Sequence, residues 1–369
     1  MAVSYHRPTK AIIDLEAIRQ NIKQEINWSK KEVFAVVKAN GYGHGLVPVA
    51  IAAAESGASG FCVATLDEGI ELRQHGLMQP ILVLSVISVQ DVLLAIKYDI
   101  SITVTSLSWL EKAQHILSEE SFSSLLKVHI KIDTGMGRIG FLTSSDVLEA
   151  ISFIDESPNF NWEGIFTHYA TADQIDSSYW KKQHGCFEKM LSKLPYLPTY
   201  VHDSNSATSL WHHSQGNMVR LGIAMYGLNP SGRAMEEVYP LKPALSLESE
   251  LIQVKYLTQG AGIGYGKTYE TTENQWIGTV PIGYADGYSR KLQGFYVLIE
   301  GKRCEIVGRI CMDQLMVRLP HEFPEGSKVT LIGRNGDEQI TLQDIADQLE
   351  TIHYEVACLL SPRIPREYK

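Results

Sequence analysis

The chain has 369 residues, of which 44% are hydrophobic and 20% charged, and its formal net charge is −9. This composition excludes an intrinsically disordered chain, which would have too little apolar surface to bury. An acidic balance without a clustered basic stripe argues against nucleic acid as a partner. The longest apolar run, around 81–89, is interrupted by serine and is far shorter than the roughly 20 residues of a membrane-spanning helix.

The five cysteines are scattered and form no CxxC pair. A disulfide framework or a structural zinc site would need closer, paired spacing, so we expect neither. The first ten residues contain no apolar segment of the kind found in secretory signals. These features together predict a cytoplasmic protein in a reducing compartment.

Short apolar, β-branched runs alternate with amphipathic stretches over the first two thirds of the chain. A short apolar run followed by a helical pattern is typical of a βα unit. Eight such units fit an α/β fold of the (β/α)8 or TIM-barrel type, which usually takes about 250 residues. A doubly wound open sheet has the same alternation and stays as the alternative. The expected strands are 33–37, 60–64, 81–85, 101–105, 127–133, 164–169, 200–204 and 219–227.

The pattern changes at residues 229–244, which are rich in proline and glycine and indicate a domain boundary. Period-2 alternation with glycine turns follows, and it predicts a mostly-β second domain, either a small barrel or a sandwich. Within it, only 341–352 and the stretch after His353 have a helical pattern. We therefore predict a barrel domain over 1–240 and a β-rich domain over 241–369, with the first ten residues as candidates for packing against the latter.

Lys38 directly follows the apolar run VFAVV, at the expected end of the first strand. Reactive groups of a βα barrel lie where its strands end. Partial burial would lower the pKa of the lysine amine and make it a nucleophile for a Schiff base. A lysine whose ammonium group simply emerges into solvent at a strand end is an equally good interpretation.

The segment TGMGRIG (134–140) follows the fifth expected strand. It resembles a glycine-rich phosphate loop but lacks the residue order of a P-loop or of a dinucleotide-binding motif. Its Arg138 has the forked donor geometry that suits a carboxylate. Lys131 lies inside the preceding strand. If Lys131 faces the barrel interior, it needs an anionic partner or a neutralising modification; an outward, solvated lysine is the alternative.

Three further strand ends carry polar side chains: His168 stands at the end of the sixth expected strand, residues 204–206 stand at the end of the seventh, and Arg220 lies in the eighth. Barrels often bind a phosphate at the loops after strands seven and eight. Taken singly, these residues are equally well explained as a core histidine, a capped turn and a surface arginine. Their common placement at strand ends favours a shared site.

Several segments together resemble one family. VVKANGYGHG (36–45) is similar, across ten positions, to the cofactor-lysine signature of the alanine racemases, pyridoxal-phosphate enzymes of bacterial wall synthesis. The resemblance continues in the family's order to the C-terminus and covers essentially the whole chain. The other matching segments are KIDTGMGRIGF, HDSNSAT, RLGIAMYG, GIGYGKTY, PIGYADGY, GRICMDQ and HYEVACLLSPRIPREY.

The resemblance implies an isomerase that interconverts L- and D-alanine by a two-base mechanism on a pyridoxal 5'-phosphate aldimine and supplies D-alanine for peptidoglycan. Lys38 would bind the cofactor and act as one base. Tyr265 would be the opposite base, reaching in from the second subunit of a homodimer, with His168 supporting it. Arg220 would face the pyridine nitrogen. We expect no metal site, and neither nucleic acid nor a membrane as a partner.

The same resemblance assigns further positions. Arg138 would contact the substrate carboxylate or the phenolic oxygen of the cofactor, and Met312 would contact the substrate through its backbone. Lys131 resembles a lysine that is carbamylated in many members, and Asp313 would have a supporting role. The phosphate would be held by Tyr42, Ser206, Gly222, Ile223 and Tyr354, and the entryway would be lined by Asp173, Tyr284, Arg290 and Arg309.

Three other functions fit part of the sequence. A barrel that binds pyridoxal phosphate without turnover would end near the barrel's own length, whereas this chain continues with Tyr265 and Met312. A related two-domain decarboxylase would need a different C-terminal half with a cysteine acid. A non-enzymatic scaffold would leave the polar strand ends unexplained. The sequence leaves open the carbamylation of Lys131, the affinity of the dimer, the breadth of substrates, and a biosynthetic or catabolic role.

Overall fold

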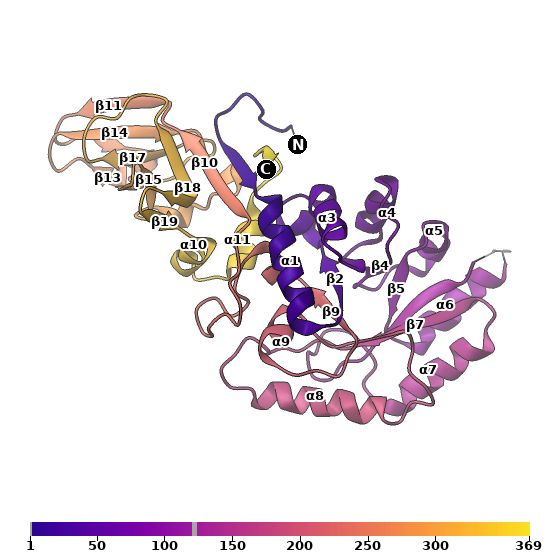
Figure 1. The fold of residues 1–369 in the computed structure, drawn as a ribbon. Helices are drawn as coiled ribbons and strands as arrows, with labels where there is room; N and C mark the ends of the chain where they lie inside the picture. The colour runs from indigo at the N-terminus through magenta and orange to yellow at the C-terminus, as the bar shows by residue number, and fades with distance from the viewer. Residues whose placement is uncertain (1, 120–123) are drawn as a thin grey trace. The chain divides into compact units, whose positions relative to one another are not determined.

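The computed structural model describes residues 2–119 and 124–369 (Figure 1). The chain divides into two compact units. The barrel unit comprises residues 16–41 and 46–243, and the β unit comprises the segment up to residue 15, residues 42–45 and residues 244–369. No helix in the described ranges is both long and apolar enough to span a bilayer.

Eight parallel strands form the centre of the barrel unit, in the order β8-β7-β6-β5-β4-β3-β2-β9. A parallel bridge between Ser204 and Val219 joins the two ends of this order, and Arg220 N donates to Ser204 O at 3.0 Å. The predicted (β/α)8 barrel is therefore confirmed, and the open doubly wound sheet is wrong. The strands are β2 (Glu32–Val36), β3 (Gly60–Val63), β4 (Ile81–Val83), β5 (Ser101–Val104), β6 (Leu126–Lys131), β7 (Phe160–Phe166), β8 (Tyr200–His202) and β9 (Met218–Leu221).

Helices follow the strands and cover the outside of the barrel (Figure 1). A hydroxyl caps the free backbone amides at the start of α4 (Leu66–Gln74), α6 (Leu107–Ser118) and α7 (Ser144–Glu156). Thr65 does so in a capping box with Glu68. Covered on both faces, the strands are almost continuously buried, which explains their unbroken apolar runs. The longer helices are α1 (Leu15–Ser29), α3 (Leu46–Glu55), α4 (Leu66–Gln74), α6 (Leu107–Ser118), α7 (Ser144–Glu156) and α8 (Ser178–Leu191), and the short ones are α2 (Lys38–Tyr42), α5 (Val92–Lys97) and α9 (Ser206–Trp211).

The β unit is built on a sheet with the strand order β16-β15-β18-β10-β1-β20, to which β19 adds by pairing with β18. A second sheet has the order β11-β14-β17, and β12 pairs with β13. The strands are β1 (Lys10–Ile13), β10 (Leu245–Glu250), β11 (Gln253–Leu257), β12 (Gly262–Ile263), β13 (Tyr269–Glu270), β14 (Gln275–Val280), β15 (Tyr296–Ile299), β16 (Lys302–Glu305), β17 (Leu315–Leu319), β18 (Lys328–Asn335), β19 (Glu338–Ile340) and β20 (Arg366–Tyr368).

Strand β1 comes from the start of the chain but lies inside the sheet of the β unit. It pairs antiparallel with β10, in the register Ala11 to Leu247, and parallel with β20. Two α-helices, α10 (Leu342–Leu349) and α11 (His353–Leu359), lie where the sequence has its helical pattern. The prediction of a mostly-β second part is confirmed.

Candidate active site

Lys38 stands at the end of β2, where the backbone turns in an unusual way. Ala39, Asn40, Gly41 and Tyr42 all have positive φ between 51° and 59°, a left-handed turn that costs non-glycine residues roughly 1–2 kcal/mol each. Hydrogen bonds compensate: Ala39 N donates to Glu68 Oε1 at 2.7 Å, and Asn40 Oδ1 accepts from Leu46 N at 2.9 Å. The half-buried Lys38 side chain is thus held where the strand ends.

Arg220 on β9 is only 3% exposed, and its guanidinium donates to neutral acceptors. Nη1 donates to His202 Nδ1 at 2.8 Å and to His202 O at 2.9 Å. Nη2 donates to Thr167 O at 2.8 Å and to His168 Nδ1 at 3.2 Å. Since a guanidinium has no acceptor, both Nδ1 atoms must be unprotonated. Each neutral imidazole therefore carries its proton on Nε2.

His168 follows β7 and lies among several cationic side chains. Burial of its ring holds the pKa of His168 well below the ordinary value, and the charges of Arg220, Arg138, Lys131 and Lys38 act in the same direction. His168 is accordingly neutral at physiological pH. Arg220, Arg138 and Lys38 thus form a positive site at the carboxyl ends of the barrel strands, to which Lys131 adds charge only below its own lowered pKa.

Lys131, the last residue of β6, is 2% exposed. Its Nζ donates to Ile132 O at 2.7 Å and lies 5.5 Å from the centre of the Phe166 ring. Burial, followed by the charge of Arg220, lowers the pKa of Lys131 to about 7. The interior position that the sequence left open is thus the one observed, and the amine is largely neutral above that pH.

The exposed Arg138 lies in a loop organised by Asp133. The Asp133 carboxylate accepts from Gly135 N at 2.9 Å, Gly137 N at 3.1 Å and Arg138 N at 3.1 Å. The backbone amides of this loop therefore bind the Asp133 carboxylate. The glycine pattern marks a turn that presents Arg138, in agreement with the absence of a P-loop residue order.

Ser206 begins α9 and lies next to the end of β9. Its Oγ accepts from Gly222 N at 2.9 Å and from Ala224 N at 3.4 Å. Ser206, Gly222 and Ile223 are all buried, and Ile223 opens the short 3-10 helix Ile223–Tyr226. Because the Ser206 oxygen accepts, its hydrogen is directed elsewhere as a donor. Asp173, half-buried, lies in the loop after β7.

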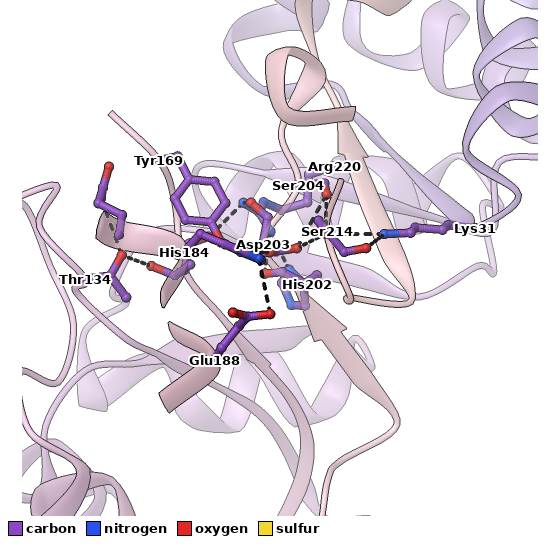
Figure 2. Close-up of polar contacts among 12 residues, drawn as sticks. Lys31, Thr134, Tyr169, His184, Glu188, His202, Asp203, Ser204, Ser214 and Arg220 are labelled. Atoms are coloured by element: carbon purple, nitrogen blue, oxygen red, sulfur yellow. Dashed lines mark hydrogen bonds and ion pairs between the residues drawn. The ribbon is translucent and has the colours of Figure 1, made fainter. Parts of the chain in front are cut away.

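A second polar cluster surrounds the buried Asp203, directly after β8 (Figure 2). Its carboxylate accepts from the Tyr169 hydroxyl at 2.8 Å and from the Ser214 hydroxyl, and it lies 3.6 Å from His184 Nδ1. His184 Nε2 in turn lies 3.3 Å from Glu188 Oε1. The neighbouring Asp203 carboxylate is the main cause that raises the pKa of His184.

In the β unit, Tyr265 opens the 3-10 helix Tyr265–Lys267 and is 71% exposed. Arg309 lies beside this turn, because a Cβ built on Gly266 would be 3.1 Å from Arg309 Nη1. The rings of Tyr42 and Tyr354 have centroids 6.3 Å apart. The structure thus brings together two pairs of the predicted residues within this unit.

Two further loops of the β unit also meet. Tyr284 N donates to Cys311 O at 3.1 Å, and Ala285 N donates to Met312 O at 3.0 Å. Tyr284 and Met312 are 42% and 52% exposed. Asp313 Oδ1 accepts from Arg363 Nη2 at 2.8 Å. The exposed Arg290 opens a separate 3-10 helix, Arg290–Leu292.

Sequence reasoning missed the polar residues that are joined to Arg220 and Asp203 directly or through one another. They are His129, Glu163, Tyr169, His184 and His202, and Asp203 itself was passed over. The available signal was a charged or imidazole side chain within an apolar strand, as in KVHIKID and YVHDS. Buried polar groups need partners, so such positions indicate an internal network even when the partners are unknown.

Comparisons with known proteins agree with this arrangement. Residues 13–230 match the family model described as "Alanine racemase, N-terminal domain", and residues 244–368 match "Alanine racemase, C-terminal domain". The chain belongs to the alanine racemase family. Alanine racemase of Ligilactobacillus salivarius is 52% identical over 373 residues, covering 100% of both chains.

Solved structures extend the comparison. The crystal structure of alanine racemase from E. faecalis has 58% identity, a TM-score of 0.98 and complete coverage of both chains. The histidine racemase from Leuconostoc mesenteroides has 32% identity and a TM-score of 0.94, over 100% of this chain and 99% of that one. Racemases named for different amino acids therefore share this fold.

Proposed function

We propose that this chain is an alanine racemase that interconverts L- and D-alanine with pyridoxal 5'-phosphate. Family membership over the full length supports the reaction class. The observation that carries the proposal is the buried guanidinium of Arg220. It donates to carbonyls and neutral imidazoles at the ends of β7 and β8, and Lys38 follows β2 of the same barrel.

The residues present fit a pyridoxal phosphate group. An anionic ligand suits a site where the charges of Arg220, Arg138 and Lys38 together lower the pKa of His168. Ser206 has a hydroxyl hydrogen to donate, at the phosphate position usual for barrels. We assign the phosphate to Tyr42, Ser206, Gly222, Ile223 and Tyr354.

When bound, the cofactor supplies a conjugated ring into which the electron pair of the substrate α-carbon is withdrawn. We place Arg220 against the pyridine nitrogen. A guanidinium keeps its proton in proteins, so Arg220 can only donate, and the nitrogen remains an acceptor. Withdrawal is then weaker than with a protonated ring nitrogen, which favours simple proton return over side reactions.

Inversion at the α-carbon needs one group to remove a proton and another to deliver one to the opposite face. We assign these roles to the Lys38 amine and the Tyr265 hydroxyl, the latter from the partner subunit of a homodimer. Tyr265 must work below the usual phenol pKa of ~10. The neutral His168, with its proton on Nε2, is the donor we propose to stabilise the phenolate.

The remaining assignments follow from the same family match. Arg138 and Met312 would contact the substrate, Lys131 as a carbamate would pair with Arg138, and Asp313 would have a supporting role. The entryway would be formed by Asp173, Tyr284, Arg290 and Arg309. The five free cysteines agree with a cytoplasmic location, where D-alanine would be made for the cell wall.

Chiral analysis of L-alanine incubated in heavy water with the full-length protein and pyridoxal phosphate tests the proposal. We expect D-alanine with deuterium at Cα. The variant Lys38→Ala should lose both turnover and the absorbance of the covalently bound cofactor. Alanine that stays L and unlabelled with wild-type protein would contradict the proposal, as would covalent cofactor retained by Lys38→Ala.

A parallel incubation with L-histidine tests the substrate. The two solved structures above, at 58% and 32% identity, favour alanine. We expect kcat/KM for alanine to exceed that for histidine by at least about a hundredfold, which corresponds to roughly 3 kcal/mol of discrimination. Faster turnover of histidine would overturn the substrate assignment while leaving the reaction class intact.

A further inference from the structure

A line of hydrogen bonds leads from Arg220 into the interior of the barrel. His202 Nε2 lies 2.9 Å from His129 Nδ1, and His129 Nε2 lies 3.0 Å from Glu163 Oε2. With the bond from Arg220 Nη1 to His202 Nδ1 at 2.8 Å, four side chains from β9, β8, β6 and β7 form one continuous chain. Both imidazoles are at most 1% exposed.

The direction of the bonds in this line follows from its two ends, the Arg220 guanidinium, which can only donate, and the Glu163 carboxylate, which can only accept. The guanidinium can only donate, so His202 Nδ1 accepts and His202 Nε2 carries the proton. His202 Nε2 therefore donates to His129 Nδ1. His129 Nε2 then carries a proton as well and donates to the Glu163 carboxylate. Burial, and after it the charge of Arg220, hold the pKa of His202 well below the ordinary value, in agreement with a neutral ring.

The residues around His129 and His202 pack closely against both rings. Gly164 on β7 lies opposite His129, and a Cβ there would be 2.2 Å from His129 Nδ1. Phe166 stacks on His202 with ring centroids 4.6 Å apart and an interplanar angle of 9°. Tyr200 stacks on the His129 ring, with centroids 5.8 Å apart. The rings are held in plane by packing, so their nitrogens cannot easily find other partners.

Glu163 ends the chain as its acceptor. The side chain is 13% exposed, and the Ser101 hydroxyl also donates to its Oε2. Burial alone would raise the pKa of Glu163, but the hydrogen bonds from His129 and Ser101, with the charge of Lys127, leave the pKa lowered. A carboxylate without protons is the acceptor that the direction of the chain requires.

We propose that Glu163 is a positioning residue for Arg220, acting through His129 and His202 by imposing one tautomer on both rings. The role in turnover rests on the proposed function, in which Arg220 faces the cofactor. Without an acceptor at position 163, His129 and His202 can exchange tautomers. A His202 ring protonated on Nδ1 can no longer accept from Arg220, and the guanidinium loses a fixed partner.

The test is nitrogen NMR of the full-length, cofactor-loaded protein with 15N-labelled histidine. Assignment uses His129→Asn and His202→Asn. In the wild type, we expect both rings to be neutral and protonated on Nε2. Glu163→Leu should give mixed tautomers at both rings, whereas Glu163→Gln, whose amide oxygen still accepts, should keep the wild-type pattern. The control Glu25→Leu removes a different buried carboxylate, which accepts from Tyr239 at 2.6 Å, and should not alter these tautomers.

Racemisation rates give the second readout. Outer partners of metal-binding residues typically contribute about tenfold to a hundredfold in activity, and we take the same scale for a partner of Arg220. We expect kcat for Glu163→Leu to fall at least about tenfold with KM nearly unchanged, and Glu163→Gln to recover most of it. An Nδ1-protonated His202 in the wild type, unchanged tautomers in Glu163→Leu, or equal losses in both variants would overturn the proposal. A wild-type protein without racemase activity would instead overturn the proposed function. The tautomers of His129 and His202 would still test the line of hydrogen bonds from Arg220 to Glu163.

Discussion

The Tyr169 hydroxyl donates to the buried Asp203 carboxylate across 2.8 Å and lies 3.0 Å from His184 Nδ1 (Figure 2). The loop after β7, the end of β8 and helix α8 are joined at this point. Burial alone would raise the pKa of Asp203, but the neighbouring His184 and the hydrogen bonds from Ser214 and Tyr169 leave it lowered. Asp203, with Glu188, in turn raises the pKa of His184. His184 and Asp203 therefore form a pair whose members shift each other's pKa in opposite directions.

This pair predicts a specific pH dependence of stability. The contribution of Asp203 is lost as pH falls through its lowered folded pKa, and that of His184 is lost as pH rises through its raised folded pKa. Asp203→Asn should lower the free energy of unfolding by about 2 kcal/mol near pH 6–7, less than the ~3–5 kcal/mol of a fully buried pair. Urea unfolding at a series of pH values measures it. We expect the difference in free energy of unfolding between wild type and Asp203→Asn to shrink at high pH. A difference that keeps growing above pH 8 would contradict this prediction.

Arg7 and Asp286 form a buried ion pair within the β unit, with bonds of 3.0 Å and 2.5 Å from the two guanidinium nitrogens to the two carboxylate oxygens. Asp286 has no exposed side-chain surface. Arg7→Met should reduce the free energy of unfolding by about 3–5 kcal/mol because a buried carboxylate loses its main partner.

The exposed pair Lys10–Glu367, with side chains 42% and 46% exposed, provides the control. Lys10→Met should cost at most about 1 kcal/mol, since water screens an exposed pair. Thermal or urea unfolding at one protein concentration compares the two variants. Equal effects would show that the burial of Asp286 is unimportant.

Alanine substitutions at Gly227 and Gly76 distinguish the effect of backbone strain from that of a steric clash. Both glycines have positive φ, 78° and 80°. A Cβ at Gly227 would lie 1.7 Å from Lys242 O, whereas nothing lies within 4 Å of one at Gly76. Gly76→Ala should lower the free energy of unfolding by about 1 kcal/mol. Gly227→Ala should lower it by about 3 kcal/mol or more, because the backbone oxygen of Lys242 cannot easily move away from the added Cβ. Urea unfolding of the two alanine variants measures the difference.

Lys131 should react with carbon dioxide. Its pKa is lowered to about 7, so at pH 8 most of the amine is neutral, and its Nζ can attack the carbon of CO₂ and release a proton to water. Carbon NMR with labelled bicarbonate should show a carbamate signal that grows as pH rises past 7 and disappears in Lys131→Met. Lys127→Met, which removes a lysine paired with Asp99 at 2.7 Å, should keep the signal. A signal that survives Lys131→Met would place the carbamate elsewhere.

Tyr265→Phe should affect proton transfer on one face much more than cofactor binding. General acid–base groups typically contribute about 10²–10⁴-fold, so we expect racemisation to fall by at least that lower factor while cofactor absorbance persists. Deuterium exchange at Cα of each alanine enantiomer identifies the face. The control Tyr256→Phe changes another exposed tyrosine of the β unit. An unchanged rate in Tyr265→Phe would remove it from the mechanism.

The sequence by itself determined the barrel and much of the family assignment. Apolar runs followed by helical patterns predict eight βα units, because burial on both faces demands unbroken apolar strands. All eight predicted runs overlap the observed strands β2 to β9. The signature around Lys38 and its companions along the chain identified the family without any coordinates.

Tertiary structure decided which distant polar residues meet. Period-2 geometry tells which face of a strand His129 or Glu163 occupies, but not which neighbour lies opposite, since that depends on register and closure of the sheet. Asp203 is an acceptable surface residue by sequence and becomes a buried anion only because Tyr169, Ser214 and His184 converge on it. The same holds for β1, whose partners β10 and β20 lie more than two hundred residues away along the chain.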